Sequence, residues 1–396
     1  MQREATKRAG DDETRAKPLR VLIVAPSLEM VGGQSIQAAR LLTALREEPS
    51  LEVSFLPVNP RLPGALNHLR KIKYLRTLLT SVAYCASLVA RVRKFDVIHI
   101  FSASYFSFLL APTPAVLVCK LYGKRCVLNY RSGEAEDHLS RWKRTARPVI
   151  RLADEIVAPS GYLVDVFARF GFHARSIFNF VDTERFRFRE RKPLRPVFFS
   201  NRNFEPLYNV ACTLRAFALI QQRFPEAKLT LAGEGSQRNE LEKLARELQL
   251  NNVTFSGRIA PERMHALYEA ADIYLNSPDI DNMPGSLIEA FAAGLPVVTT
   301  NAGGIPYILS DGQTGLMVER GDCEAMAERA LRLLEDEKLA SEISSRAREE
   351  CRKYEWTNVR REWLKLYEEV ARKNVLKNNE RAGEQLIEDG ARAIER

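Results

Sequence analysis

The sequence predicts an α/β protein built from two doubly wound domains, each with a mostly parallel sheet. Short apolar runs, typical of buried parallel strands, alternate with helix-like segments along most of the 396 residues. This alternation begins at Arg20 to Ser27, "RVLIVAPS", and begins again after a charged, Pro-containing stretch, Arg189 to Pro196. The chain is long enough for two domains of ordinary size, each with its own core.

The expected strands fall into two sets. In the first domain, residues 20–188, they are "RVLIVAPS", "LEVSFLPV", "FDVIHIFS", "RCVLNYR" and "EIVAPS". In the second domain, residues 197–353, they are "VFFSN", "KLTLAGEG", "VTFSGRI", "IYLNSP" and "PVVTT". Because ligands of such folds bind beyond the carboxyl ends of parallel strands, we expect a cleft between the domains with the functional residues at those strand ends. Residues 189–196 are the expected linker.

The two ends of the sequence are polar. Residues 1–19 lack the apolar core of a signal peptide and are typical of a disordered lead-in, while residues 374–396 are typical of a solvated tail. Between them, residues 354–373 carry Trp356, Val359 and Trp363 on one helical stripe, which predicts a helix that packs one face against another part of the protein.

The composition favours a soluble globular protein, with 45% hydrophobic and 28% charged residues. The six cysteines include no C-x-x-C pair, so neither a zinc cluster nor a disulfide framework is indicated, and a cytoplasmic setting is the simplest interpretation. We expect no metal and no cofactor. Nucleic-acid binding is not expected, because the basic residues border apolar segments without an aromatic stacking motif.

Basic residues are concentrated in the first half. Residues 1–190 carry 30 Lys and Arg against 18 Asp and Glu, a net charge of +12, in a chain whose total is +9. In the segment Lys71 to Lys94, basic residues lie on both sides of an apolar stretch. Such a segment suits the surface of an anionic membrane, but it equally suits an amphipathic core helix with solvated ends. The uncharged run 101–119 is interrupted by Pro112 and Pro114, so we expect it inside a domain rather than across a membrane.

One stretch, "DNMPGSLIEAFAAGLPVVTT" from Asp281 to Thr300, has an unusual order of residue types. Pro284 resists helix formation, Ser286 can cap a helix and Gly294 can end one, and a β-branched run follows. The stretch therefore predicts a loop, a short helix, a turn and a strand.

The same stretch combines two binding chemistries. A helix N-terminus offers unpaired amides to a phosphate, and the carboxylates of Asp281 and Glu289 can accept hydrogen bonds from sugar hydroxyls. Glu289 precedes an Ala- and Phe-rich run that a solvated carboxylate does not need, which favours a functional role over a place on a surface helix. The stretch predicts a site for a sugar joined to a phosphate.

Two glycine pairs are further candidates. Gly32 and Gly33 lie between the first strand and the following helix, where their amides suit a phosphate, and Gly233 and Gly235 end another strand. Plain tight turns explain both pairs as well. Neither a G-x-G-x-x-G fingerprint nor a Walker A run occurs.

The stretch from Asp281 resembles the E-x7-E signature of glycosyltransferase family 4, which are retaining enzymes with the GT-B architecture of two Rossmann-like domains facing a central cleft. Other stretches agree with the family in order: "APSLEMVGGQSIQAARL", "SIFNFVDTERF", "NRNFEPLYNV", "LTLAGEGS", "VTFSGRI", "LYEAADIYLNSP" and "NAGGIPYILSDGQTGLMV". The resemblance extends from Arg20 to Tyr367, and it implies that residues 354–373 form a helix that crosses back onto the first domain.

The resemblance also implies roles for single residues. Arg202, Asp281 and Glu289 would be the catalytic set, with Arg202 offsetting charge on the leaving diphosphate and Glu289 binding the ribose hydroxyls of the donor. The implied donor-binding residues are Gly32, Gly33, Gly233, Gly235, Arg258, Ile259, Met283, Pro284, Gly285, Ser286 and Leu287. In the first domain, His99 ends a strand and Arg131 and Glu134 lie in a loop after another, so we name these three as acceptor-side candidates. A histidine satisfied within the core is the favoured alternative for His99, and a solvated loop is an equal alternative for Arg131 and Glu134.

The resemblance predicts a retaining glycosyltransferase that moves a sugar from a nucleotide-sugar donor to a glycan or lipid-linked acceptor, at the inner face of a membrane, in cell-surface polysaccharide or glycolipid synthesis. The sequence departs from the family pattern at four places. Asp281 replaces a glutamate, Tyr307 replaces another glutamate, Phe180 replaces a glycine, and no lysine stands five positions after Arg202. The missing lysine motivates an alternative, a non-catalytic nucleotide- or glycan-binding protein on the same fold.

Overall fold

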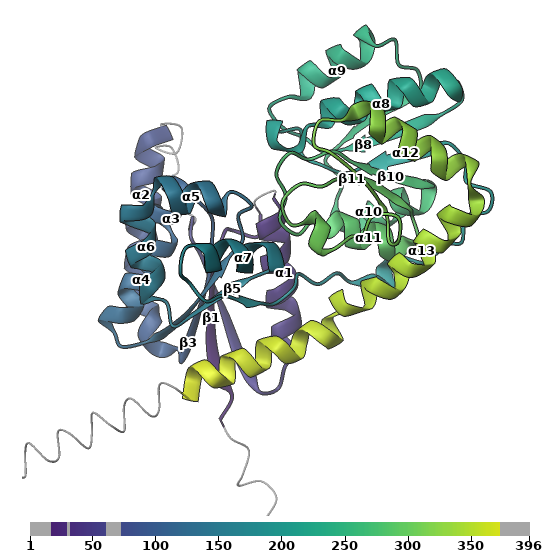
Figure 1. Cartoon of the computed structure of the whole chain (residues 1–396). Coiled ribbons are helices and arrows are strands. Elements are labelled where there is room, and N and C mark those ends of the chain that lie inside the picture. The colour runs from purple at the N-terminus through teal and green to yellow at the C-terminus, as the bar shows by residue number, and fades with distance from the viewer. Residues whose placement is uncertain (1–16, 30–31, 61–72, 373–396) are drawn as a thin grey trace, which may run out of the picture.

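The structure is a computed structural model that describes residues 17–29, 32–60 and 73–372. Most of the predicted lead-in, the whole predicted tail 374–396 and Lys71 lie outside these residues. The described chain forms two α/β units with a sheet each, and helices lie on both faces of each sheet (Figure 1). The predicted fold class is confirmed.

The first sheet has six parallel strands in the order β2-β1-β3-β4-β5-β6. The strands are β1 (Leu19–Ala25), β2 (Leu51–Pro57), β3 (Val97–Ser102), β4 (Arg125–Tyr130), β5 (Glu155–Ala158) and β6 (Arg175–Ser176). The helices between them are α1 (Gly33–Arg46), α2 (Lys73–Arg91), α3 (Tyr105–Leu110), α4 (Pro112–Leu121), α5 (Ala135–Arg141), α6 (Lys143–Leu152) and α7 (Gly161–Arg169).

The second sheet repeats this plan with the order β12-β11-β10-β7-β8-β9, again all parallel. Its strands are β7 (Val197–Ser200), β8 (Lys228–Ala232), β9 (Val253–Gly257), β10 (Ile273–Asn276), β11 (Val297–Thr300) and β12 (Leu316–Val318). Its helices are α8 (Val210–Arg223), α9 (Arg238–Glu247), α10 (Pro261–Ala270), α11 (Gly285–Ala293), α12 (Cys323–Glu335) and α13 (Glu337–Cys351).

Strand β1 shows why its sequence is apolar throughout. Leu22 and Val24 are buried in the core on one face of the sheet, and Val21 and Ile23 are buried in the core on the other face. Successive side chains of a strand point to opposite faces, so a strand covered on both faces needs apolar residues at every position.

The helix at residues 356–372 returns to the first domain (Figure 1). Its buried residues Val359, Trp363 and Tyr367 share one core with Val21 and Ile23 of β1. The apolar stripe of this helix is therefore a packing face that covers the first sheet.

The chain passes from one domain core to the other earlier than the sequence predicted. Phe180 belongs to the core of the first domain and Val181 to a core of the second. The expected linker at 189–196 is thus wrong as a domain boundary, because these residues lie on the second domain. Charge and proline content suggested an exposed connection, but here the charge forms buried contacts.

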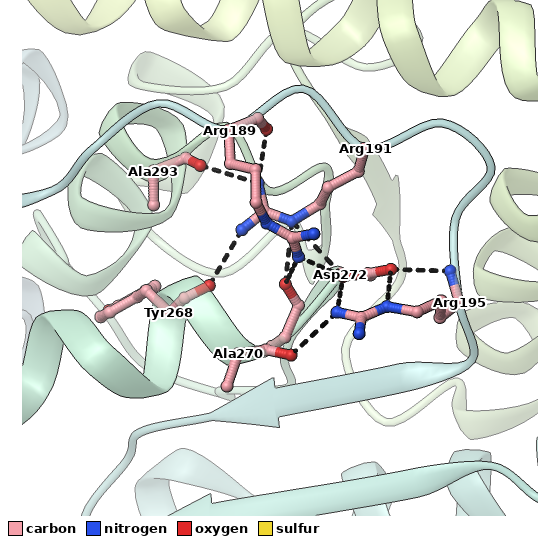
Figure 2. Close-up of polar contacts among 8 residues, drawn as sticks. Arg189, Arg191, Arg195, Tyr268, Ala270, Asp272 and Ala293 are labelled. Carbon is pink, nitrogen blue, oxygen red and sulfur yellow. Dashed lines mark hydrogen bonds and ion pairs between the residues drawn. The ribbon is translucent and has the colours of Figure 1, made fainter.

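Those contacts converge on one carboxylate, Asp272 (Figure 2). Arg189 and Arg195 form ion pairs with Asp272 Oδ1 at 2.5 Å and 2.8 Å. Arg191 is buried and donates to the backbone carbonyls of Ala271, Ala293 and Tyr268 at 2.8 Å, 2.8 Å and 3.0 Å. Burial lowers the pKa of Arg191 to about 10. These ion pairs and hydrogen bonds fix the segment to the ends of α10 and α11, and within this network the buried Arg189 Nε has no hydrogen-bond partner.

The uncharged run 101–119 is not a single helix. It contains the end of β3, all of α3 and most of α4, and the break falls at Ala111 because Pro112 occupies the first turn of α4. By length and composition, one described helical segment, Leu75–Lys94, could cross a membrane. Its residues Tyr84, Leu88 and Val92 are buried in the core of the first domain, which places this segment against the domain.

Candidate active site

Most of the predicted donor-binding residues lie at one edge of the second sheet. Arg202 follows β7, Gly233 and Gly235 follow β8, Arg258 and Ile259 follow β9, and Asp281 follows β10. Because all these strands are parallel, their carboxyl ends bring the four loops to the same edge. The geometry thus gathers residues that are up to 80 positions apart in the sequence.

Helix α11 begins two residues earlier than a cap at Ser286 would place it. Gly285 is its first residue and Pro284 is the N-cap, so Ser286 is not the cap and lies inside the first turn. Its hydroxyl accepts a hydrogen bond from Arg202 Nη1 at 3.2 Å. Gly294 ends the helix in the left-handed region with a φ of 73°, as predicted from its position.

Arg202 and Asp281 form an ion pair through Arg202 Nη2 and Asp281 Oδ2. Both side chains are nearly buried, and Asp281 Oδ1 also accepts from the backbone amide of Asn282 at 2.8 Å. The Arg202 guanidinium lies 4.2 Å from the centre of the Tyr208 ring. Burial raises the pKa of Asp281, and the charge of Arg202 opposes this rise without cancelling it. The pair therefore places one fixed cation beside the N-terminus of α11.

Glu289 is buried, with apolar neighbours along α11, as its sequence context predicted. Glu289 Oε2 lies 3.0 Å from the Tyr268 hydroxyl, and Glu289 Oε1 accepts from Arg40 Nη2 at 2.8 Å. Arg40 belongs to α1 of the first domain, so this ion pair crosses between the domains. A carboxylate has about four lone-pair positions, so it can accept hydrogen bonds from sugar hydroxyls in addition to these two contacts.

The glycine pairs differ in what surrounds them. A Cβ on Gly233 or Gly235 would overlap the carbonyl oxygen of Arg202 or Phe204, so these glycines let β8 and the loop after β7 approach closely. A Cβ on Gly32 or Gly33 would meet nothing within 4 Å. The first pair therefore has a packing role, while the second pair, at the start of α1, leaves room among the described residues where a side chain would stand.

The remaining donor-side residues divide by exposure. Met283 is buried, and its carbonyl oxygen accepts from Asn179 Nδ2 at 3.1 Å. Leu287 is buried in a core of the second domain, and Ile259 is half-buried against that core. Arg258 is exposed at the end of β9. Of these, Arg258 is the side chain with the freedom to reach a ligand.

The acceptor-side candidates occupy different environments. Arg131 donates to the Asn179 side chain, and burial lowers the pKa of Arg131 to about 10. Glu134 is exposed, and its pKa is raised by partial burial and by the charge of Asp137. A Cβ on the intervening Gly133 would lie 3.4 Å from the backbone carbon of Asp281, so this loop contacts the second domain beside the Arg202–Asp281 pair.

His99 does not reach the cleft, and its acceptor-side role is corrected here. It is buried between the rings of Phe101 and Trp363, with centroid distances of 5.0 Å and 4.7 Å. Its Nδ1 lies 2.7 Å from the Tyr367 hydroxyl and its Nε2 lies 2.9 Å from Asn129 Nδ2. Burial, with a smaller effect of the Arg131 charge, lowers its pKa to about 3. His99 is a neutral core residue whose two ring nitrogens are both occupied.

Sequence reasoning missed three residues at this site, Arg40, Asn179 and Tyr268. Tyr268 lies in "LYEAADIYLNSP" and Asn179 lies in "SIFNFVDTERF", so both occur in family motifs that signalled a role without naming the residue. Arg40 is one basic residue on an amphipathic helix, and nothing in its local pattern sets it apart. Among the residues that the structure describes, no group of three His, Cys, Asp or Glu side chains is arranged to hold a metal.

Solved structures share this architecture at low sequence identity. HepE of Anabaena, solved in complex with UDP-glucose, superposes with a TM-score of 0.68 and 17% identity over 90% of this chain and 99% of its own. Sucrose-phosphate synthase of Thermosynechococcus elongatus gives a TM-score of 0.71 and 18% identity over 89% of this chain and 99% of its own. These likenesses establish the GT-B fold.

Curated relatives are glycosyltransferases. Sulfoquinovosyl transferase SQD2 of Arabidopsis thaliana is 26% identical over 390 residues, which span 89% of this chain and 74% of that protein. The phosphatidyl-myo-inositol mannosyltransferase of Mycolicibacterium smegmatis is 30% identical over 179 residues, which span 45% of this chain and 46% of that protein. A bacterial N-acetylgalactosaminyltransferase of Campylobacter jejuni that acts on an undecaprenol-linked glycan is 30% identical over 164 residues, which span 41% of this chain and 45% of that protein.

Two family models cover most of the sequence. The model described as "Glycosyltransferase Family 4" matches residues 31–185, and the model described as "Glycosyl transferases group 1" matches residues 182–350. Their boundary falls next to the point where the chain crosses from the first core to the second at Phe180 and Val181. The chain belongs to the group 1 glycosyltransferases of family 4, with the GT-B fold.

Proposed function

We propose that this glycosyltransferase transfers a sugar from a nucleoside diphosphate sugar to a lipid-linked glycan or glycolipid acceptor, with retention of the anomeric configuration. The observation that carries the proposal is the convergence of Arg202, Asp281 and Glu289 on one short buried helix, α11. This arrangement offers a cation and helix amides to a diphosphate and carboxylates to sugar hydroxyls within the same site.

Each of these residues has a distinct part in the proposed reaction. The first-turn amides of α11 and the Arg202 guanidinium hold the diphosphate, and Arg202 stabilises the negative charge that grows on it as the glycosidic bond to the sugar breaks. Glu289 accepts hydrogen bonds from the ribose, with Tyr268 fixing the other carboxylate oxygen. Asp281 faces the sugar; burial raises its pKa, and the charge of Arg202 opposes that rise.

The lipid-linked acceptor is proposed from the relatives. The printed names include enzymes acting on phosphatidyl-myo-inositol and on an undecaprenol-linked glycan. The donor class is proposed on similar grounds, because HepE and other neighbours of the same fold were solved with UDP or UDP-glucose. We propose a cytoplasmic enzyme that works at the inner membrane face, without a metal.

Calorimetric titration of UDP, GDP and ADP and their sugar conjugates into the wild-type chain and Glu289→Ala tests the donor site. We expect one nucleotide class to bind the wild type and to lose at least about tenfold in affinity in the variant, because a ribose hydroxyl loses a charged acceptor. Glu342→Ala, which removes an exposed glutamate from α13 of the same domain, is the matched control. If folded wild type binds none of these nucleotides, or if Glu289→Ala binds as tightly as Glu342→Ala, the donor site is not at α11.

A further inference from the structure

The first domain exposes an unusual number of large apolar side chains on three consecutive helices. Of the fourteen such side chains exposed among the described residues, seven lie on α2, α3 and α4: Leu78, Val82, Val89, Phe106, Leu110, Leu117 and Leu121. Phe106 is 70% exposed and Leu121 is 74% exposed. Single exposed apolar residues need no explanation, but seven on neighbouring helices point to a partner.

These side chains are ordered within each helix. Leu78 and Val82 on α2, Phe106 and Leu110 on α3, and Leu117 and Leu121 on α4 are each four residues apart, so each pair occupies one side of its helix. The helices also pack on one another, α2 against α4 and α3 against α4. Figure 1 shows the three helices on the side of the first domain that faces away from the second domain.

Positive charge accompanies the apolar residues. From Lys73 to Lys124 the sequence has seven Lys and Arg and one acidic residue, Asp96. Asp96 is paired with Arg20 at 2.8 Å, outside the three helices. At the end of α2, Arg93 lies 4.1 Å from the centre of the Tyr122 ring that follows α4, and Arg93 and Lys94 are both exposed. The C-terminal ends of α2 and α4 thus form one basic border.

The helix α2 is attached to the domain along its other side. Tyr84 and Leu88 are fully buried in the core, the Tyr84 hydroxyl donates to the Ala111 carbonyl at 2.9 Å, and Arg91 Nη1 donates to the Phe55 carbonyl at 3.1 Å. Crossing a membrane would expose these polar groups and empty that part of the core. The apolar side chains of α2 are therefore available for contact with a surface while the helix stays in place.

We propose that the face formed by α2, α3 and α4 docks the enzyme on an anionic lipid bilayer, with the seven apolar side chains in the headgroup region and the basic residues at its border on the anionic lipids. Two carboxylates of neighbouring segments touch these helices: Asp154 pairs with Lys120 at 2.5 Å, and Asp137 accepts from the Tyr105 hydroxyl at 2.6 Å. The helices themselves carry Lys and Arg but no Asp or Glu, and Arg93 and Lys94 remain exposed at the end of α2. An apolar face with exposed basic residues at its border combines the hydrophobic and the electrostatic attraction of interfacial binding.

The docking face is connected along the chain to the cleft edge of the first sheet. Helix α3 follows directly after β3, whose carboxyl end lies at the cleft edge of the first sheet, and Gln34 Nε2 of α1 lies 3.5 Å from the carbonyl of Ser102 at that strand end. A bilayer on this face would present a lipid-linked acceptor to the cleft from the side of the first domain. This last step rests on the proposed function, whereas docking itself does not.

Vesicle flotation tests the docking face with the full chain. The vesicles are phosphatidylcholine alone, or phosphatidylcholine with about 30% phosphatidylglycerol. The variants are Phe106→Ser with Leu121→Ser for the apolar contact, and Arg93→Glu with Lys94→Glu for the charges. The control is Phe188→Ser with Lys243→Glu, which changes an exposed aromatic and an exposed lysine on the second domain.

We expect the wild type and the control to bind the anionic vesicles and to bind the neutral vesicles at least about tenfold more weakly. Each docking-face variant should lose at least about tenfold in anionic vesicle binding, because the first loses two apolar side chains that would enter the headgroup region and the second reverses two positive charges. In the charge variant alone, vesicle binding should also become nearly independent of the salt concentration. Nucleotide titration on the same samples should be unchanged, so a failure of the donor site is seen separately.

Three outcomes would overturn the proposal. The first is wild-type protein that does not float with anionic vesicles at low salt. The second is a docking-face variant that floats as well as the control. The third is a wild-type dimer that Phe106→Ser with Leu121→Ser converts to a monomer in light scattering, without vesicle binding, which would assign the face to a second copy of the chain.

Discussion

Arg40 of the first domain donates to Glu289 of the second domain at 2.8 Å, and the two residues are 249 positions apart. Arg40 Nη1 also lies 3.8 Å from the position that a Cβ on Gly285 would take. Helix α1 thus reaches the N-terminal turn of α11, where the diphosphate is proposed to bind. Glu289, which is proposed to bind the ribose, is therefore held by Tyr268 of its own domain and by Arg40 of the opposite domain.

We predict that Arg40→Ala lowers kcat for sugar transfer by about tenfold, because the pair holds the two halves of the site together and small misplacements are costly. Nucleotide affinity should change less than about threefold, since Glu289 keeps its contact with Tyr268. Steady-state kinetics and calorimetry check the two quantities. Arg346→Ala, which breaks an exposed pair within α13, is the control and should change neither. A loss confined to nucleotide affinity would contradict the closing role of Arg40.

We predict that alanine substitutions in the two glycine pairs differ in their effect on stability. Gly233→Ala should lower the free energy of unfolding by about 2 kcal/mol or more, because the new methyl group overlaps the Arg202 carbonyl and displaces that loop. Gly33→Ala has room for its methyl group, so it should leave stability within about 0.5 kcal/mol of the wild type. Chemical denaturation measures both.

Nucleotide binding then separates the two roles. If the amides at the start of α1 receive a phosphate, Gly33→Ala should weaken nucleotide binding at least about threefold despite normal stability. Unchanged nucleotide affinity in Gly33→Ala would leave that glycine as a plain turn residue.

The fold was predictable because its signal is local and repeated. Each apolar strand run is short and is followed by a helical pattern, and the carboxyl ends of the strands then had to share one edge. The cluster of Arg202, Asp281 and Ser286 follows from that arrangement, since two of its members lie on one loop and helix.

Other features were not predictable, because they depend on contacts between distant residues. No local pattern distinguishes Arg40 from other basic residues of amphipathic helices, and its partner lies in another domain. The linker was misplaced for the same reason. The arginines of residues 189–196 have the composition of an exposed connection, and only the position of Asp272 shows that they are anchored. The sequence suggested that His99 ends a strand, but β3 continues to Ser102, and Trp363 and Tyr367 come from the far end of the chain to cover His99.

His99 predicts a pH dependence of stability. Its pKa is lowered from 6.5 to about 3 in the folded protein by burial, so between these values the unfolded chain binds a proton that the folded chain does not. The free energy of unfolding should therefore fall as the pH decreases from about 6.5 toward 3, by at most about 1.4 kcal/mol per pH unit from this group.

The variant His99→Gln removes this contribution, so its unfolding free energy should depend less steeply on pH than that of the wild type in the same window. His138, whose pKa is lowered to about 4, contributes equally to both proteins and cancels in the comparison. His173→Gln changes an exposed imidazole on the same domain and controls for the substitution. Equal pH slopes for wild type and His99→Gln would mean that His99 titrates alike in the folded and unfolded chains.

We predict that the attachment of segment 189–196 to the second domain depends on the carboxylate of Asp272. In Asp272→Ala, the buried Arg191 and the two flanking arginines lose their shared counter-charge, so the folded state keeps positive charges close together with reduced compensation. We expect a loss of about 3–5 kcal/mol in the free energy of unfolding. Asp96→Ala, which removes the exposed partner of Arg20, should cost no more than about 1 kcal/mol.

The stabilisation by the Asp272 carboxylate should depend on pH. Partial burial raises the pKa of Asp272, but hydrogen bonds from Arg195 and Arg189 outweigh this and hold the pKa below its usual value. The stabilisation is therefore present above the pKa of the unfolded chain and is lost as the pH falls through the lower, folded value. Asp272→Ala should be less stable than the wild type at neutral pH, and the difference should shrink on acidification. A difference that stays constant down to the acid limit would mean that packing around Asp272, rather than its charge, fixes the segment.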